Sequence, residues 1–68
     1  MTYKEAKALG YKPGDMMLTY GYVSRKVNLD DQEVFEAKGS RKGQLYILAP
    51  NWKSTTYCYR MYLKKESE

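Results

Sequence analysis

Apolar residues near the start of the chain recur at the spacing of a helix. Tyr3, Ala6 and Leu9 lie three residues apart, which places them on one helical face. Thr2 and Glu5 have the spacing of a capping box, and Gly10 stands where helices commonly end. The pattern predicts a short helix over about residues 2–10. This helix must dock on the rest of the fold, because so short a helix is unstable alone.

Beyond this helix the pattern changes to short runs of β-forming residues separated by turn residues. Lys12-Pro13-Gly14-Asp15 has the composition of a type II turn, and Gly39-Ser40-Arg41-Lys42-Gly43 has that of a hairpin loop. Because no helix separates the runs, we expect antiparallel pairing. The predicted strands cover about residues 16–27, 33–38, 44–49 and 55–64.

These elements predict an α+β fold in one small domain over residues 1–68, with the N-terminal helix followed by a four- to five-stranded antiparallel sheet. Gly21, inside the first run, indicates a bulge or a bend. If Gly21 divides that run, the sheet has five strands and suits a small SH3-like or OB-like barrel. The Lys12-Pro13-Gly14-Asp15 turn also resembles the entry to many SH3-like barrels, although over four residues only.

Alternation along the later strands assigns the core and leaves a surplus of aromatic rings. Alternate side chains of a strand share a face, and the expected core consists of Leu18, Val23, Val34 or Phe35, Leu45, Ile47, Tyr59, Met61 and Leu63. The chain has eight tyrosines, one Trp and one Phe. So many rings exceed what a core of this size holds, so we expect several of them at the surface.

The net charge of +4 is unevenly distributed. Residues 44–65 contain Lys53, Arg60, Lys64 and Lys65 and no acidic residue. Clustered cations attract phosphates or acidic surfaces. The same pattern is also typical of a solvated face that keeps a protein soluble.

The composition removes most routes to catalysis. The chain has no histidine and one cysteine, Cys58, so it has no Ser-His or Cys-His pair and no zinc site of the usual Cys/His kind. Asp30 and Asp31 are better explained as turn formers. The loop at 39–43 lacks the spacing of a Walker motif. We expect a protein that is not an enzyme and carries no metal or cofactor.

A lone cysteine suits a reducing compartment, and the sequence shows neither a signal peptide nor a run long enough to span a membrane. The expected location is the cytoplasm.

Basic and aromatic residues alternate in a way that is typical of nucleic-acid binding. Proteins that bind single strands combine a cationic track with exposed rings on which bases stack. We expect a binding face for nucleic acid, or for a protein that handles it, formed by Tyr22, Arg25, Lys26, Arg41, Lys42, Tyr46, Trp52, Lys53, Tyr57 and Arg60. The same tyrosines would equally serve as cross-strand pairs that support the sheet.

A second hypothesis is a protein-binding inhibitor or adaptor of the compact kind carried by phages and mobile elements. It rests on the small size, the missing catalytic residues and the abundance of Tyr, Trp, Met and Arg, which are enriched at protein interfaces. Trp52, in a loop after Pro50, would be its anchor. A homodimer formed through an unpaired sheet edge is compatible with either hypothesis.

Overall fold

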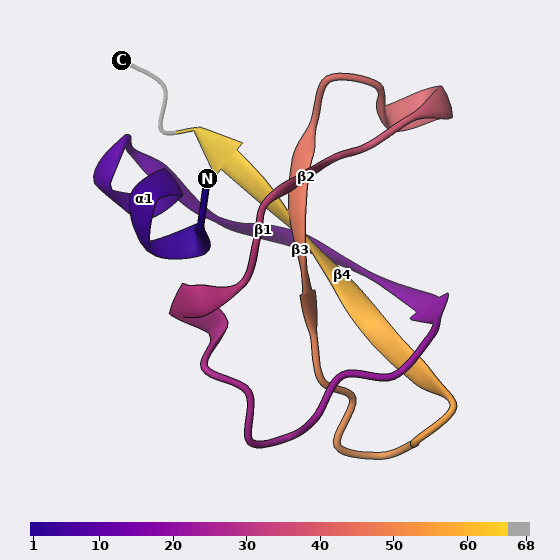
Figure 1. Ribbon diagram of the computed structural model, residues 1–68. Coiled ribbons are helices and arrows are strands. Elements are labelled where there is room, and N and C mark those ends of the chain that lie inside the picture. Colours follow the sequence, from indigo (N-terminus) through magenta and orange to yellow (C-terminus); the bar gives the residue numbers. More distant parts are fainter. Residues whose placement is uncertain (66–68) are drawn as a thin grey trace.

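The computed structural model describes residues 1–65, which form one short helix and a four-stranded antiparallel sheet (Figure 1). The helix α1 spans Tyr3–Ala8. The strands are β1 at Tyr11–Tyr20, β2 at Phe35–Glu36, β3 at Leu45–Ala49 and β4 at Tyr57–Lys65. Two single-turn 3₁₀ helices, η1 at Leu29–Asp31 and η2 at Gly39–Arg41, lie in the connections.

The predicted capping box starts α1. The Thr2 hydroxyl accepts a hydrogen bond from the Glu5 amide, and the Glu5 carboxylate accepts one from the Thr2 amide at 2.8 Å. Two amides that the helix itself cannot pair are satisfied in this way. Gly10 follows the last turn with φ of 101°, a conformation that other residues rarely adopt.

The start of the first strand differs from the prediction. β1 begins at Tyr11, and the residues expected to form a turn, 12–15, lie within it. Pro13 pairs with Leu63, the register then shifts, and pairing resumes at Met16. Proline is tolerated here because β1 is an edge strand, and a bulge absorbs the one extra residue, since Gly14 and Asp15 lie opposite Tyr62 alone. β1 ends at Tyr20, before the predicted limit of residue 27, where Gly21 bends the chain.

The strand order β1-β4-β3-β2 leaves the sheet open, so the expected SH3-like barrel is wrong. Closure would require β1 to pair with β2, yet β2 is only two residues long and the two strands lie at opposite edges. Residues 21–34 run from one edge to the other without forming a strand. On their way they pair with the chain start, where the Tyr3 amide donates to the Gln32 carbonyl and the Val34 amide to the Met1 carbonyl.

The main core lies between α1 and one face of the sheet. Tyr3 and Ala6 of α1 pack with Ile47, Met61 and Leu63, and all five side chains are buried. Ile47 and Met61 are direct cross-strand partners. Ile47, Met61 and Leu63 of the predicted core are therefore confirmed, and the partly buried Val34 and Leu45 pack against them. Leu18, and Phe35 as the alternative to Val34, lie outside the core.

Leu18 and Phe35 are exposed because each lies on an edge strand that no helix covers at that point. In their place the opposite face of the sheet buries Cys58 and Tyr62, which alternate with the core residues of β4. Both faces of the central strand β4 are thus partly covered.

Candidate nucleic-acid interface

The structure divides the predicted site residues into two groups. Six of them lie in or beside the two loops at one end of the sheet, which is the lower end in Figure 1. We call these six the loop-end patch: Tyr22, Arg25, Lys26, Trp52, Lys53 and Tyr57. The other four, Arg41, Lys42, Tyr46 and Arg60, belong to β3, β4 and the β2–β3 hairpin.

Strand pairing brings the two loops of the loop-end patch together. Tyr20, at the end of β1, pairs with Tyr57 at the start of β4, and their rings meet edge to face at 5.9 Å between centroids. The Gly21 amide then donates to the Thr56 carbonyl at 3.1 Å. The loop after β1 and the loop before β4 therefore leave the sheet side by side.

A direct hydrogen bond fixes the two loops to each other. Nη2 of Arg25 donates to the carbonyl oxygen of Trp52 at 2.9 Å. Within the second loop, the buried Asn51 accepts a hydrogen bond from the Lys53 amide at 2.9 Å through its side-chain oxygen, which forms an Asx turn around Trp52. These two hydrogen bonds fix the backbone that carries the indole.

The rings of the loop-end patch face solvent. The exposed fractions are 67% for Tyr22, 60% for Trp52 and 42% for Tyr57, and the neighbouring Tyr20 is 80% exposed. The surplus of aromatic residues expected from the sequence is therefore concentrated at this end. Rings in this state contribute little to the core and offer flat apolar surfaces to a ligand.

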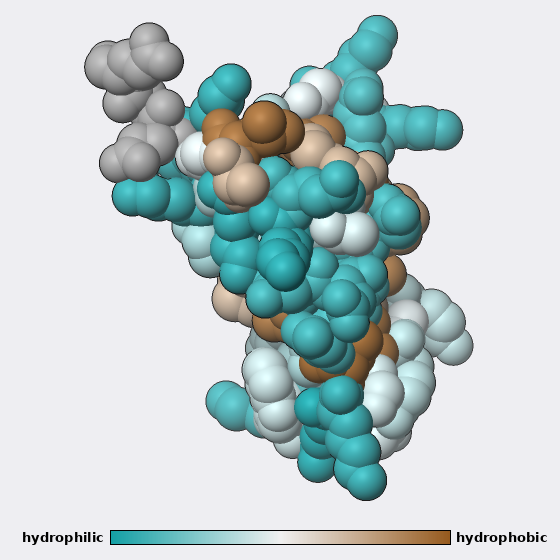
Figure 2. All heavy atoms as spheres, turned by 60° about the vertical axis from the view of Figure 1, so that its left-hand side comes forward, coloured by the Kyte–Doolittle hydropathy of each residue, from teal (hydrophilic) through white to brown (hydrophobic). Residues whose placement is uncertain are grey.

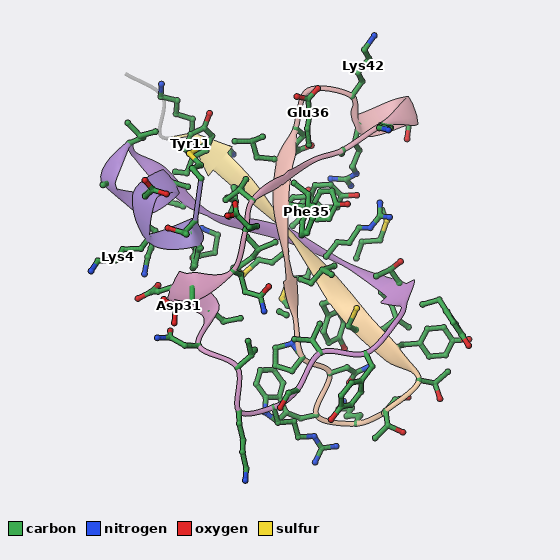
Figure 3. The ribbon with its side chains drawn as sticks, viewed as in Figure 1. Lys4, Tyr11, Asp31, Phe35, Glu36 and Lys42 are labelled. Atoms are coloured by element: carbon green, nitrogen blue, oxygen red, sulfur yellow. The ribbon has the colours of Figure 1, made fainter. Side chains whose placement is uncertain are left out.

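The loop-end patch has cations and no acids. Arg25, Lys26 and Lys53 are exposed, and neither residues 16–29 nor residues 44–65 contain an aspartate or a glutamate. Within residues 1–65 the acidic residues lie outside these two stretches, and two of them have cationic partners: Asp30 forms an ion pair with Lys7 of α1, and Glu33 lies 3.3 Å from the N-terminal ammonium. Figure 3 shows Asp31 on the same side of the molecule as Lys4 of α1.

Three residues of the second group join two further rings in a layer on the face of the sheet away from α1. We call this layer the sheet-face cluster: Phe35, Arg41, Tyr46, Arg60 and Tyr62. The Phe35 ring stacks on Tyr46 at 5.5 Å, and Tyr46 contacts Tyr62 at 5.6 Å. Arg60 lies over the Tyr46 ring and Arg41 over the Tyr62 ring, at 4.8 and 4.3 Å from the centroids. These contacts are cation–π pairs.

An open hollow of about 410 Å³ lies beside this cluster, lined by Phe35, Glu36, Lys38, Tyr46 and Arg60. A hydrogen bond with Tyr62, together with the nearby Tyr46, raises the pKa of Arg60 above its ordinary value, so the guanidinium stays charged. The cluster is less purely cationic than the loop-end patch, because Glu36 lines the hollow and Asp15 lies 3.8 Å from Arg41.

Sequence reasoning missed two members of the sheet-face cluster and joined two residues that the fold separates. Phe35 was expected in the core as an alternative to Val34, and Tyr62 was assigned to no site. Cross-strand ring pairs with Tyr46, from β2 for Phe35 and from β4 for Tyr62, would have indicated both, but only once the register was known. Tyr57 and Arg60 are separated because residues three apart in a strand point to opposite faces. Lys42, at the tip of the β2–β3 hairpin, points away from the body of the protein (Figure 3).

Three further features of the described residues concern metal binding, disulfides and membrane-spanning helices. Within residues 1–65, the His, Cys, Asp and Glu side chains nowhere form a group of three that could hold a metal ion. Cys58 is a buried thiol without a disulfide partner. Over the same range, α1 and the 3₁₀ turns are all too short to cross a bilayer.

The face turned forward in Figure 2 is mainly hydrophilic, with hydrophobic side chains surfacing in small separate areas. Comparison with known proteins adds no relative: no protein-family model matches the chain, and neither does any curated protein or solved structure.

Proposed function

We propose that this protein is a non-catalytic nucleic-acid-binding domain that holds single-stranded nucleic acid at the loop-end patch. The observation that carries the proposal is the arrangement of exposed Tyr22, Trp52 and Tyr57 among three cations, with no acid in residues 16–29 or 44–65. Bases stack on such rings, and Lys and Arg neutralise the adjacent phosphates.

Preorganisation supports the same proposal. The hydrogen bond from Arg25 to the Trp52 carbonyl joins the two loops before any ligand arrives, so less conformational entropy is lost on binding. Unpaired bases are the favoured ligand, since a duplex keeps its base faces stacked and offers the rings only edges and phosphates.

The sheet-face cluster has a secondary place in this proposal. Tyr46 already carries Arg60 on one side and the Phe35 ring on another, so its ring is largely occupied within the protein. Arg41 and Arg60 would extend the cationic track along the sheet for a longer strand. The cytoplasm, where the thiol of Cys58 stays reduced, is the compartment we propose.

A fluorescence titration tests the proposal directly. Trp52 is the single tryptophan of the chain, so its emission reports on the loop-end patch alone. Short single-stranded DNA and RNA oligonucleotides are expected to quench this emission at low salt, with weaker quenching by a duplex of the same sequence. Absence of binding at low salt, or binding that salt does not weaken, would overturn the proposal.

A pull-down with the same protein distinguishes nucleic-acid binding from the second hypothesis, a protein-binding inhibitor or adaptor. In a pull-down from lysate, a partner that is lost after nuclease treatment supports nucleic-acid binding. A partner that survives nuclease, and that also competes with Trp52 quenching, favours the adaptor.

A further inference from the structure

The outer edge of β1 carries apolar side chains that the fold leaves uncovered. β1 lies at one end of the strand order, and within residues 1–65 only β4 pairs with it. Met16, Met17 and Leu18 are 52%, 43% and 53% exposed. Edge strands in natural proteins usually carry charges or prolines that prevent further pairing. In β1 such residues stop at Asp15, and the second half of the strand has none.

The direction of the backbone groups along this edge follows from one hydrogen bond. The Gly21 amide donates a hydrogen bond to the carbonyl of Thr56, the residue just before β4, and so points away from the open edge. Successive residues of an antiparallel strand direct their N–H and C=O groups to opposite sides, so Thr19 and Met17 also direct these groups toward β4. Met16, Leu18 and Tyr20 therefore direct their N–H and C=O groups to the open edge. Their side chains also share one face of the sheet.

Charge decides which occupant fits this edge. Residues 16–24 contain no charged side chain, whereas the chain as a whole carries +4. A nucleic acid finds no cation here to neutralise its phosphates. Two copies of the protein, however, can approach along this edge without placing like charges opposite each other.

We propose that two copies pair through β1 as an antiparallel, two-fold symmetric dimer centred on Leu18. In this register Leu18 faces Leu18 of the second copy, and Met16 faces Tyr20. Every outward N–H and C=O of these three residues then finds a partner, and their side chains form one apolar strip on the same face. The register is self-complementary, as a two-fold interface requires, and it joins two four-stranded sheets into one.

The size of the contact sets its strength. Pairing is confined to the half of β1 after the register shift, between Met16 and Tyr20. A contact of this length falls at the small end of specific interfaces, so the dimer dissociates on dilution. This proposal does not depend on nucleic-acid binding, and its tests contain no nucleic acid.

Sedimentation velocity over a range of protein concentrations tests the dimer. Wild-type protein is expected to shift from monomer to dimer as concentration rises. Leu18→Lys places two cations opposite each other at the two-fold axis and should raise the midpoint concentration by at least about tenfold. Leu9→Lys is the matched control, since Leu9 is similarly exposed (59%) but lies at the end of α1, and it should leave the midpoint unchanged.

Cross-linking tests the register without relying on a charge. Opposed residues of an antiparallel pair lie about 5.5 Å apart at Cα, within disulfide range. Leu18→Cys should therefore form a covalent dimer under mild oxidation much faster than Leu9→Cys does. A wild-type protein that stays monomeric at all concentrations, a Leu18→Lys variant that dimerises normally, or equal rates for the two cysteine variants would each overturn the proposal.

Discussion

Replacing Lys53 with glutamine should weaken the salt dependence of single-strand binding by a definable amount. For single strands the slope of log affinity against log salt is about −0.7 for each phosphate neutralised. The loop-end patch supplies three cations, Arg25, Lys26 and Lys53, so wild-type protein should show a slope of about −2. Lys53→Gln should reduce it to about −1.4. Between about 50 and 200 mM salt, affinity would then fall ~18-fold for wild type and ~7-fold for the variant.

Fluorescence polarisation of an end-labelled single-stranded oligonucleotide, titrated at several salt concentrations, measures both slopes. Lys4→Gln is the control, because Lys4 lies on the exposed side of α1 and should keep the wild-type slope. An unchanged slope in Lys53→Gln, or an equal reduction in both variants, would refute the assignment of phosphates to the loop-end patch. A wild-type slope near −3.5 would instead mean that two further cations, such as Arg41 and Arg60, also contact the strand.

Three further substitutions separate stacking, capping and core packing. Trp52→Leu should weaken binding about 5- to 150-fold, the value of one base stack of about 1–3 kcal/mol, at unchanged salt slope; a changed slope would argue against stacking. The amide of Thr2 lowers the pKa of Glu5 below its ordinary value of 4.5, so the stability from ionised Glu5 is present above pH 4.5 and is lost as pH falls through the lowered pKa. The difference in melting temperature between wild type and Glu5→Gln should therefore shrink below pH 4.5, and a constant difference would contradict this. Ile47→Val removes one methylene from a fully buried site and should cost about 0.5–1.5 kcal/mol, or about 2–12 °C in melting temperature by calorimetry, whereas exposed Leu9→Val should change it little.

The parts of the fold that depend on neighbours in sequence could be predicted. The capping box of α1 needs only Thr2 and Glu5 three residues apart, and the structure forms both of its hydrogen bonds. Alternation along β4 correctly placed Met61 and Leu63 on the core face. Both features are set within a few residues, where propensity and spacing operate.

The features that depend on distant partners could not be predicted. Pro13 and Gly14 indicate a turn by composition, but β4 lies alongside them and the chain continues as a strand with a register shift. Gly14 suits this close approach, since a Cβ there would lie 3.0 Å from the Tyr62 carbonyl oxygen. Phe35 looks like a core residue until β2 proves to be a two-residue edge.

The candidate site follows the same division. The excess of rings and the absence of acids from residues 44–65 are visible in the sequence, and they indicate which residue types to examine. The hydrogen bond between Arg25 and Trp52 joins residues that only strand pairing brings together. The sequence therefore indicated the residues of the loop-end patch. It did not indicate that the fold separates them from Arg41, Lys42, Tyr46 and Arg60.

The strand order also has a consequence for how the protein assembles. β2, β3 and β4 are joined by short connections and can pair as soon as each hairpin closes, whereas β1 must wait for β4, beyond the whole of β2 and β3 in the chain. Closing so large a loop is slow, so β1 is expected to join the sheet last. In refolding followed by pulsed hydrogen exchange, the amide hydrogens that join β1 to β4 should then become protected later than those that join β3 to β4.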